Sequence, residues 1–396
     1  MSRLEEDVFI VEPLRTAIGK FGGSLASESA VQLGAFIARE VVSRAGVDPL
    51  TIDEVVFGHA RQAGAGPNPA RQIAVRSGLT PSVPAYTVNQ ACASGLRSIW
   101  SAADQIRLGE AAIVLAGGTE SMSNTPYMVP RVRWGLRMGD AELVDGMTRD
   151  GFMCPLADQL MGATAENLAD QYALTRSEQD AYAVESQRKA SAAWAAGAFD
   201  AEVVPYVIET KKGSETFGRD EHLRSDATVE GMKKLPPVFR KDGTVHAGNS
   251  SGITDGASAM LVASGEAVRA QGMKPLARIV GYAQAGVDPK VMGIGPVPAT
   301  RSLLSEVGMT LADIDLVELN EAFAAQVIAC DRELGFDHDR LNVHGGSIAL
   351  GHPIGCTGAR IVTTLVHALR RHDKAVGLAT LCVSGGMGMS MIVERV

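Results

Sequence analysis

Two distant parts of this chain have similar sequences. The first match aligns residues 46–58 with 308–320 and pairs Gly46 with Gly308, Ile52 with Ile314, Asp53 with Asp315 and Val55 with Val317. Further along, Ser94-Gly-Leu-Arg97 aligns with Thr357-Gly-Ala-Arg360 at nearly the same spacing. After each comes a helical stretch, then an apolar strand that leads into paired glycines. Several matched features in one order indicate a duplication, so we expect two related halves.

Each half is predicted to run strand, helix, strand, helix, strand. Residues 29–45 have helical apolar spacing and end near Gly46. Residues 94–108 form a second predicted helix, with Gly109 placed to terminate it. Continuous apolar strands between helices are typical of parallel or mixed sheets covered on both faces. We therefore expect a layered α/β protein whose two similar lobes meet about a pseudo-twofold axis.

Residues from about 122 to 251 have no counterpart in the other half. They include two predicted helices, at 163–172 and 177–196. We interpret this stretch as an inserted loop domain that covers a site or an interface. The N-terminal lobe then comprises 1–121 plus 252–272, and the C-terminal lobe comprises 273–396. A chain of 396 residues exceeds the usual limit for a single core, which agrees with several units.

Composition excludes several classes of partner. The net charge of −8 is spread along the chain, which argues against nucleic acid because a backbone binder needs a basic field. No run of 18 apolar residues is present, so we expect no membrane span. The N-terminal sequence lacks the features of a signal or transit peptide. The five cysteines are odd in number and have no metal-ligand spacing, so we expect free thiols, no metal and a cytoplasmic location.

Cys92 is the first candidate for chemistry. It lies between the extended 86–88 and the helix that begins near Ser94, where the helix N-terminus favours a thiolate. The helix dipole contributes at most about 1 kcal/mol, so a thiol needs a partner base as well. The alternative is an inert buried cysteine beside a helix end.

Three further residues are candidates. His352 lies in a stretch rich in glycine, before the helix that corresponds to the one after Cys92, so a twofold axis can bring the two together. Cys382 ends an apolar strand before a glycine run, where backbone N–H groups can form an oxyanion hole. Asn320 ends another strand, and its amide can orient a water. Structural roles, a buried strand cysteine for Cys382 and a helix N-cap for Asn320, are the alternatives.

Together these residues resemble the thiolase family over nearly the whole chain. The resemblance implies a duplicated thiolase-like fold of two βαβαβ-type lobes in α-β-α-β-α layers, and an acetyl-CoA C-acyltransferase. It also implies no cofactor, with coenzyme A as a substrate. The matching motifs are Asn89-Gln-x-Cys-x-Ser-Gly95, Asn320-Glu-Ala-Phe323, Gly351-His-Pro-x-Gly355 and Cys382-x-x-Gly-Gly-x-Gly388.

The resemblance also implies catalytic roles. Cys92 would carry the acyl group as a thioester, and His352 would take the proton of Cys92 and help hold the thioester oxygen. Cys382 would move a proton on or off the α-carbon of acetyl-CoA. Asn320 would position a water in one oxyanion hole, and the backbone N–H groups of Cys92 and Ser384 would form the second.

Binding residues and assembly follow from the same resemblance. Arg224 and Ser251 would contact CoA, Ala247 would line the pantetheine path, and Met161 and Phe323 would line the acyl pocket. The stretch from Arg131 to Arg137 resembles a loop through which dimers pair into a homotetramer.

Three positions depart from the family pattern. Ser384 replaces the first of three glycines, Gly231 replaces a CoA-contacting serine, and Leu160 replaces a histidine of short-chain biosynthetic members. Leu160 favours a broader or degradative 3-ketoacyl-CoA thiolase, with a role in fatty acid β-oxidation, over a biosynthetic acetoacetyl-CoA thiolase. Two functions outside the thiolases compete with this interpretation, a decarboxylating ketoacyl synthase and a scaffold with an inactive site.

Overall fold

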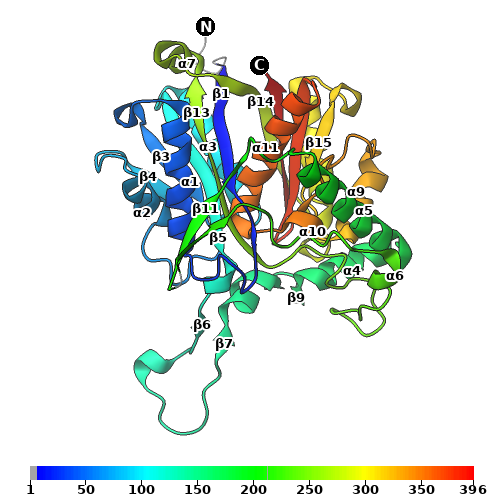
Figure 1. Ribbon diagram of the computed structural model, residues 1–396. Helices are drawn as coiled ribbons and strands as arrows, with labels where there is room; N and C mark the ends of the chain where they lie inside the picture. The colour runs from blue at the N-terminus through cyan, green and yellow to red at the C-terminus, as the bar shows by residue number, and fades with distance from the viewer. Residues whose placement is uncertain (1–6, 212) are drawn as a thin grey trace.

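The computed structural model describes residues 7–211 and 213–396 (Figure 1). Within this part of the chain, no helix has both the length and the apolar character needed to cross a bilayer. One mixed sheet runs through the molecule in the order β15-β16-β17-β14-β1-β13-β5-β3-β4.

The N-terminal half contributes β1, β3, β4, β5 and β13. Strand β3 pairs in parallel with β4 and β5, whereas β13 is antiparallel to both β5 and β1. The bounds are β1 Val8–Thr16, β2 Gly19–Lys20, α1 Ala30–Ala45, β3 Glu54–Gly58, α2 Pro69–Arg76, β4 Ala85–Val88, α3 Ser94–Leu108, β5 Ile113–Ser121, β13 Thr254–Ser264 and α7 Gly265–Gln271.

The C-terminal half repeats much of this order. Strand β15 is parallel to β16, β17 is antiparallel to β16 and β14, and β14 joins the halves by pairing with β1. The bounds are β14 Pro275–Gly286, α8 Pro296–Val307, β15 Leu316–Leu319, α9 Ala324–Leu334, α10 Ser347–Leu350, α11 Ile354–Arg371, β16 Val376–Val383 and β17 Met387–Arg395.

The predicted layers are confirmed. Helices α3 and α11 share one apolar cluster with strands of both halves, so they lie between the two halves of the sheet. Helices α1 and α2 cover the outer face of the N-terminal half, and α8 and α9 cover that of the C-terminal half. The predicted helix 94–108 coincides with α3, and Gly109 adopts the left-handed conformation expected of a C-cap. The first half contains helix α2 and strand β4 in addition to the five predicted elements.

The sequence match between the halves has a structural cause. One Asp53 carboxylate oxygen accepts the N–H groups of Ala112 and Ile113, at 2.7 and 2.9 Å. One Asp315 carboxylate oxygen accepts those of Ala375 and Val376, at 2.9 and 3.0 Å. Each aspartate thus fixes the start of the strand beside its own. These hydrogen bonds require a short side chain with an acceptor oxygen at this position, so aspartate occupies it in both halves.

The two central helices cross backbone to backbone. A Cβ atom on Gly95 would lie 2.6 Å from the backbone N of Ala359, and one on Gly358 would lie 2.2 Å from that of Leu96. Only glycine permits this approach. Gly95 and Gly358 are equivalent in the repeat, so the pseudo-twofold relation predicted from sequence places the N-terminal ends of α3 and α11 side by side.

The insertion contains small sheets and helices. Helix α5 begins at Arg176, before the predicted Ser177, because Thr175 and Glu178 form a capping box. Helix α4 begins two residues earlier than predicted, at Met161. A long hairpin around β6 and β7 projects from the body (Figure 1). The bounds are β6 Tyr127–Met128, β7 Val144–Asp145, β8 Met153–Cys154, β9 Gln159–Leu160, α4 Met161–Gln171, α5 Arg176–Ala195, β10 Val203–Val204, β11 Tyr206–Thr210, β12 Gly213–Phe217 and α6 Val229–Met232.

Candidate active site

Cys92 lies in a tight turn between β4 and α3. The Ser94 hydroxyl donates to the carbonyl oxygen of Ala91 at 2.7 Å and accepts the N–H of Gln90 at 2.9 Å. The Asn89 side-chain oxygen accepts the N–H of Ala91 at 3.0 Å. Ala91 has a φ of 45°, a left-handed conformation that is strained for a residue with a Cβ. These hydrogen bonds hold the strained turn and so fix the direction of the Cys92 side chain.

His352 lies in the equivalent turn before α11. Its Nδ1 is 2.6 Å from the Thr357 hydroxyl, and that hydroxyl donates to the carbonyl oxygen of Pro353 at 3.0 Å. The single hydroxyl proton is therefore used, so His352 Nδ1 carries the proton and Nε2 keeps its lone pair. Burial, with smaller contributions from the positive charges of Arg360 and Arg61, lowers the pKa of His352 to about 3. The imidazole is neutral near pH 7 and can accept a proton.

Cys382 and Ser384 lie at the end of β16. Burial and the neighbouring Cys92 raise the pKa of the fully buried Cys382 thiol well above its usual value. Burial also raises the pKa of the Cys92 thiol, which a hydrogen bond from the Ser384 backbone and the charge of Arg61 partly oppose. The positive φ angles fall on Gly385 and Gly386, at 92° and 88°. Ser384 therefore takes the place of a glycine without strain, and its N–H points to Cys92.

One small cavity brings these groups together. Its volume is about 60 Å³, and apolar side chains from the insertion and from the α9 region close it. The predicted residues Cys92, His352, Cys382, Ser384, Met161, Phe323 and Ser251 all line it, and so do Arg61, Ala91, Gly151, Phe152, Met292, Ala322 and Ile354.

Asn320 is buried at the end of β15 and is not among these lining residues. The N-cap interpretation of Asn320 is wrong, because α9 begins at Ala324 and Phe323 is its N-cap. The Asn320 side-chain oxygen accepts the Ser347 hydroxyl at 2.6 Å, whereas its Nδ2 has no hydrogen-bond partner within the described residues. This amide N–H is available to a water or a substrate oxygen.

Arg224 and Ala247 are exposed and lie outside the cavity. Ser251 connects their loops to the site, since its N–H donates to the carbonyl oxygen of Ala322 at 3.0 Å. Ser250 also forms an isolated antiparallel β-bridge with Phe323. The end of the insertion is thus held against the segment that precedes α9.

Sequence reasoning missed Glu120 and Arg61. The Glu120 carboxylate accepts the N–H groups of Ala60, Arg61 and Gly355 at 2.8 to 3.1 Å, and lies 3.0 Å from His59 Nε2. It therefore holds the loop after β3 against the start of α11. The available signal for Glu120 was a charged residue near the end of a strand that begins with a continuous apolar run.

The thiolase N-terminal domain family matches residues 8–266, and the thiolase C-terminal domain family matches residues 273–395. The chain belongs to the thiolase family. It is accordingly an acyltransferase enzyme, as the sequence motifs indicated.

Relatives of this thiolase match over nearly their full length. The acetyl-CoA acetyltransferase of Escherichia coli is 51% identical to this chain, and the match covers 98% of each chain. The acetyl-CoA acetyltransferase of Cupriavidus necator is also 51% identical, and the match covers 98% of this chain and 99% of the other. The crystal structure of human mitochondrial 3-ketoacyl-CoA thiolase is 44% identical and superposes with a TM-score of 0.97, covering 99% of this chain and 100% of the other.

Proposed function

We propose that this thiolase cleaves 3-ketoacyl-CoA with free CoA, giving acetyl-CoA and a shortened acyl-CoA, and catalyses the reverse Claisen condensation. One observation carries this proposal. Two thiols and a neutral imidazole, Cys92, Cys382 and His352, line one small cavity where α3 and α11 begin. A retro-Claisen cleavage needs a nucleophile, a base for that nucleophile and an acid for the departing carbanion.

In the first half-reaction, Nε2 of His352 takes the Cys92 proton as the sulfur attacks the 3-keto carbonyl. The Cα–Cβ bond then breaks, the acyl group stays on Cys92, and the Cys382 thiol protonates the acetyl-CoA carbanion. The backbone N–H groups of Cys92 and Ser384 stabilise the tetrahedral oxyanion. A water held by the Asn320 amide, together with His352, stabilises the enolate oxygen.

In the second half-reaction, CoA enters in place of acetyl-CoA and gives its thiol proton to the Cys382 thiolate. Its sulfur attacks the Cys92 thioester, and the shortened acyl-CoA leaves as Cys92 recovers its proton from the His352 imidazolium. One product leaves before the second substrate enters, so the kinetics are ping-pong. The site supplies both proton acceptors from its own side chains, and we propose that no cofactor takes part beyond CoA as a substrate.

The preferred direction can be proposed from Leu160, and the chain length from the cavity. Leu160 precedes Met161 at the start of α4, in the position where short-chain biosynthetic members have a histidine. This favours degradation of 3-ketoacyl-CoA, as in β-oxidation. The cavity of about 60 Å³ restricts the acyl group to a short chain. Acetoacetyl-CoA synthesis is the alternative, and the acetyl-CoA acetyltransferases that are 51% identical support it.

We propose that CoA extends from the cavity to the exposed Arg224, past Ala247 and Ser251. A human mitochondrial 3-ketoacyl-CoA thiolase solved in complex with CoA is 44% identical and has a TM-score of 0.95 to this chain. Arg224 presents a positive charge at the protein surface, which suits a phosphate.

We propose a homotetramer that pairs dimers through the β6–β7 hairpin. Trp134 and Met138 are 86% and 98% exposed on this projecting segment, and Leu136 and Leu143 are also exposed. Apolar side chains gathered on a projecting loop mark a protein interaction site. All five cysteines are free, which suits a reducing compartment such as the cytoplasm.

The direct test is loss of the 3-ketoacyl-CoA enolate absorbance after addition of free CoA, together with mass spectrometry of the enzyme after brief exposure to substrate without CoA. We expect turnover and one acyl group on the peptide that contains Cys92. Malonyl-CoA consumption with release of carbon dioxide would instead support a ketoacyl synthase. Constant absorbance at high enzyme concentration would support a scaffold.

A further inference from the structure

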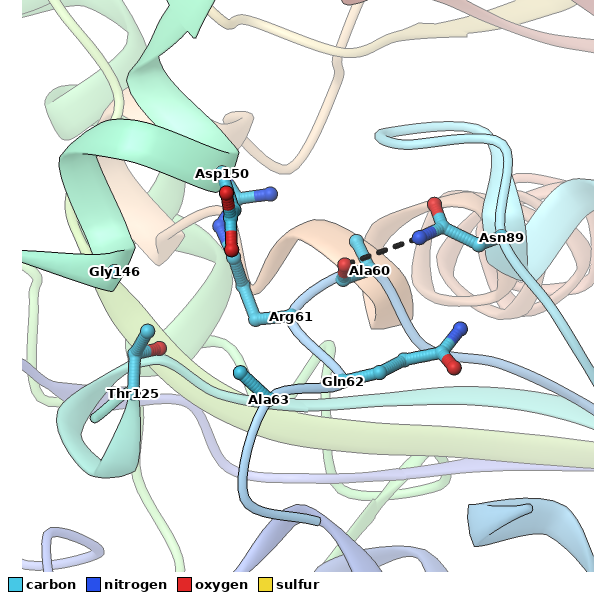
Figure 2. A pocket seen from close by; sticks show the side chains of 8 residues that line it. All are labelled: Ala60, Arg61, Gln62, Ala63, Asn89, Thr125, Gly146 and Asp150. Atoms are coloured by element: carbon cyan, nitrogen blue, oxygen red, sulfur yellow. Dashed lines mark hydrogen bonds between the residues drawn. The ribbon is translucent and has the colours of Figure 1, made fainter. Parts of the chain in front are cut away.

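Arg61 lies between the catalytic cavity and a second cavity. It follows β3 in the chain, only 7% of its surface is exposed, and it lines the cavity that contains Cys92. It also lines a neighbouring cavity of about 330 Å³, where Gln62, Asn89, Thr125 and Asp150 supply polar groups (Figure 2).

Two of the three guanidinium nitrogens of Arg61 lack hydrogen-bond partners within the part of the chain that the structure describes. Its Nε and Nη2 are buried and have no hydrogen-bond partner. It also has no salt bridge within 4.0 Å among these residues. Its planar face lies against Gly151, where a Cβ atom would meet Nη2 at 2.1 Å, and its charge is 5.8 Å from the Phe152 ring.

Glu120 and Asp150 both interact electrostatically with Arg61, but neither accepts a hydrogen bond from its guanidinium among the described residues. Glu120 already accepts three backbone N–H groups and pairs with His59, so its oxygens are occupied. Asp150 has a side chain that is 52% exposed, and it forms an ion pair with Arg149 at 4.0 Å. Solvent screens a carboxylate exposed to this degree.

An unpaired buried guanidinium is costly unless something binds it. Arginine cannot relieve that cost by losing its proton, and its fork of N–H groups matches a carboxylate. The group that fits is therefore a carboxylate on a substrate that enters the catalytic cavity. Because Cys92 and Arg61 line the same small cavity, the carboxylate must be a few bonds from the acyl carbon.

We propose that Arg61 binds a carboxylate at the far end of the acyl group, so that the substrates include short 3-oxo dicarboxylic acyl-CoA thioesters. This rests on the proposed thiolase reaction and specifies its substrate class. With the six-carbon member, 3-oxoadipyl-CoA, the Cα–Cβ bond breaks, the acetyl-CoA carbanion gains a proton, and the succinyl group passes from Cys92 to the sulfur of CoA.

The test compares 3-oxoadipyl-CoA with 3-oxohexanoyl-CoA, which have the same chain length and differ in a terminal carboxylate or methyl group. We expect kcat/KM to be higher for 3-oxoadipyl-CoA. Arg61→Leu should lower the ratio of the two kcat/KM values at least tenfold. The ratio cancels any effect of the Arg61 charge on Cys92 itself, because both substrates acylate the same thiol.

Asp150→Asn is the matched control. It removes the nearby negative charge and should keep or raise the ratio. A preference of the parent enzyme for 3-oxohexanoyl-CoA, or a ratio that Arg61→Leu leaves unchanged, would overturn the proposal.

A binding measurement tests the proposal when the variants do not fold or when no substrate turns over. Calorimetry with the unmodified enzyme should show tighter binding of succinyl-CoA than of butanoyl-CoA, and equal or weaker binding would overturn the proposal even if Arg61→Leu and a second variant, Arg61→Gln, fail to fold. If neither these substrates nor acetoacetyl-CoA turn over, the thiolase reaction itself fails, and the binding comparison still decides the role of Arg61.

Discussion

His352 Nδ1 lies 2.6 Å from the hydroxyl of Thr357, one turn into the helix that follows. Ser94, the repeat equivalent of Thr357, holds the turn of Cys92 with its own hydroxyl. The two halves therefore use equivalent hydroxyl groups to orient the proposed nucleophile, Cys92, and the proposed base, His352.

Thr357→Val keeps the shape of Thr357 but leaves Nδ1–H of His352 without an acceptor. An unsatisfied buried group costs about 1–3 kcal/mol. We expect this free energy to lower kcat roughly tenfold to a hundredfold, with a smaller change in KM. Thr357→Ser should restore most of the activity, measured by steady-state thiolysis. Equal losses in both variants would argue that Thr357 only fills space.

Cys92→Ser and Cys382→Ser should separate the two half-reactions. Without the Cys92 thiol, we expect no acyl-enzyme and, above about pH 9, where the parent reacts fastest, no rapid reaction with iodoacetamide. Cys382→Ser should still form the acyl-enzyme but barely condense it. Mass spectrometry measures both, and Cys330→Ala, which removes another buried thiol, is the control. Equal labelling of Cys92→Ser and the parent would show that another cysteine is the nucleophile.

The pH dependence of Cys92 alkylation follows from its raised pKa. Burial disfavours the thiolate, so less of it is present at pH 7 than for a free thiol. The rate of inactivation by iodoacetamide should therefore keep rising above pH 9 rather than level off near the ordinary value of about 8.5. A plateau below pH 7 would mean that the resting enzyme already holds a thiolate–imidazolium pair.

Much of this architecture could be predicted because duplication marks the residues that both halves need. Asp53 and Asp315 are such a pair, and Cys92 and His352 precede matched helices. Arg61 could not be found this way. A cation in a loop after a strand normally faces solvent, and here Gly151 and Phe152, from the distant insertion, cover it. Long-range packing of this kind leaves no local pattern in the sequence.

Buried neutral histidines should make the fold sensitive to acid. The pKa of His344 falls to about 4 and that of His352 to about 3, mainly through burial. In the unfolded chain the histidine pKa is about 6.5, so below that pH the unfolded chain binds more protons than the folded chain. The contribution of these histidines to the free energy of unfolding is therefore full above about pH 6.5 and is lost as the pH falls toward 4. His344→Gln should weaken this pH dependence of the urea midpoint. An unchanged dependence would contradict this assignment.

Trp134→Glu combined with Met138→Glu should change assembly and leave the cavity intact. Charges on the exposed apolar hairpin oppose its association. We expect light scattering to give the mass of the proposed tetramer for the parent and half that mass for the variant, with kcat per subunit within about twofold, since removing a surface contact leaves the site untouched. A tetramer that persists would place its contacts elsewhere.

Gly358→Ala should be among the most damaging small substitutions, because its Cβ would lie 2.2 Å from a backbone atom of the facing helix. We expect a loss of about 3 kcal/mol or more in the free energy of unfolding. Gly218→Ala, whose Cβ would be 3.4 Å from its nearest neighbour, is the matched control. Similar denaturation curves for both variants would show that the helices can separate at no cost.

The crossing at Gly95 and Gly358 leaves no layer of side chains that could slide or act as a hinge. The proposed nucleophile, Cys92, precedes one of these helices, and the proposed base, His352, precedes the other. Any relative motion of the two halves would have to separate the helix backbones, so this contact sets the distance between the two turns.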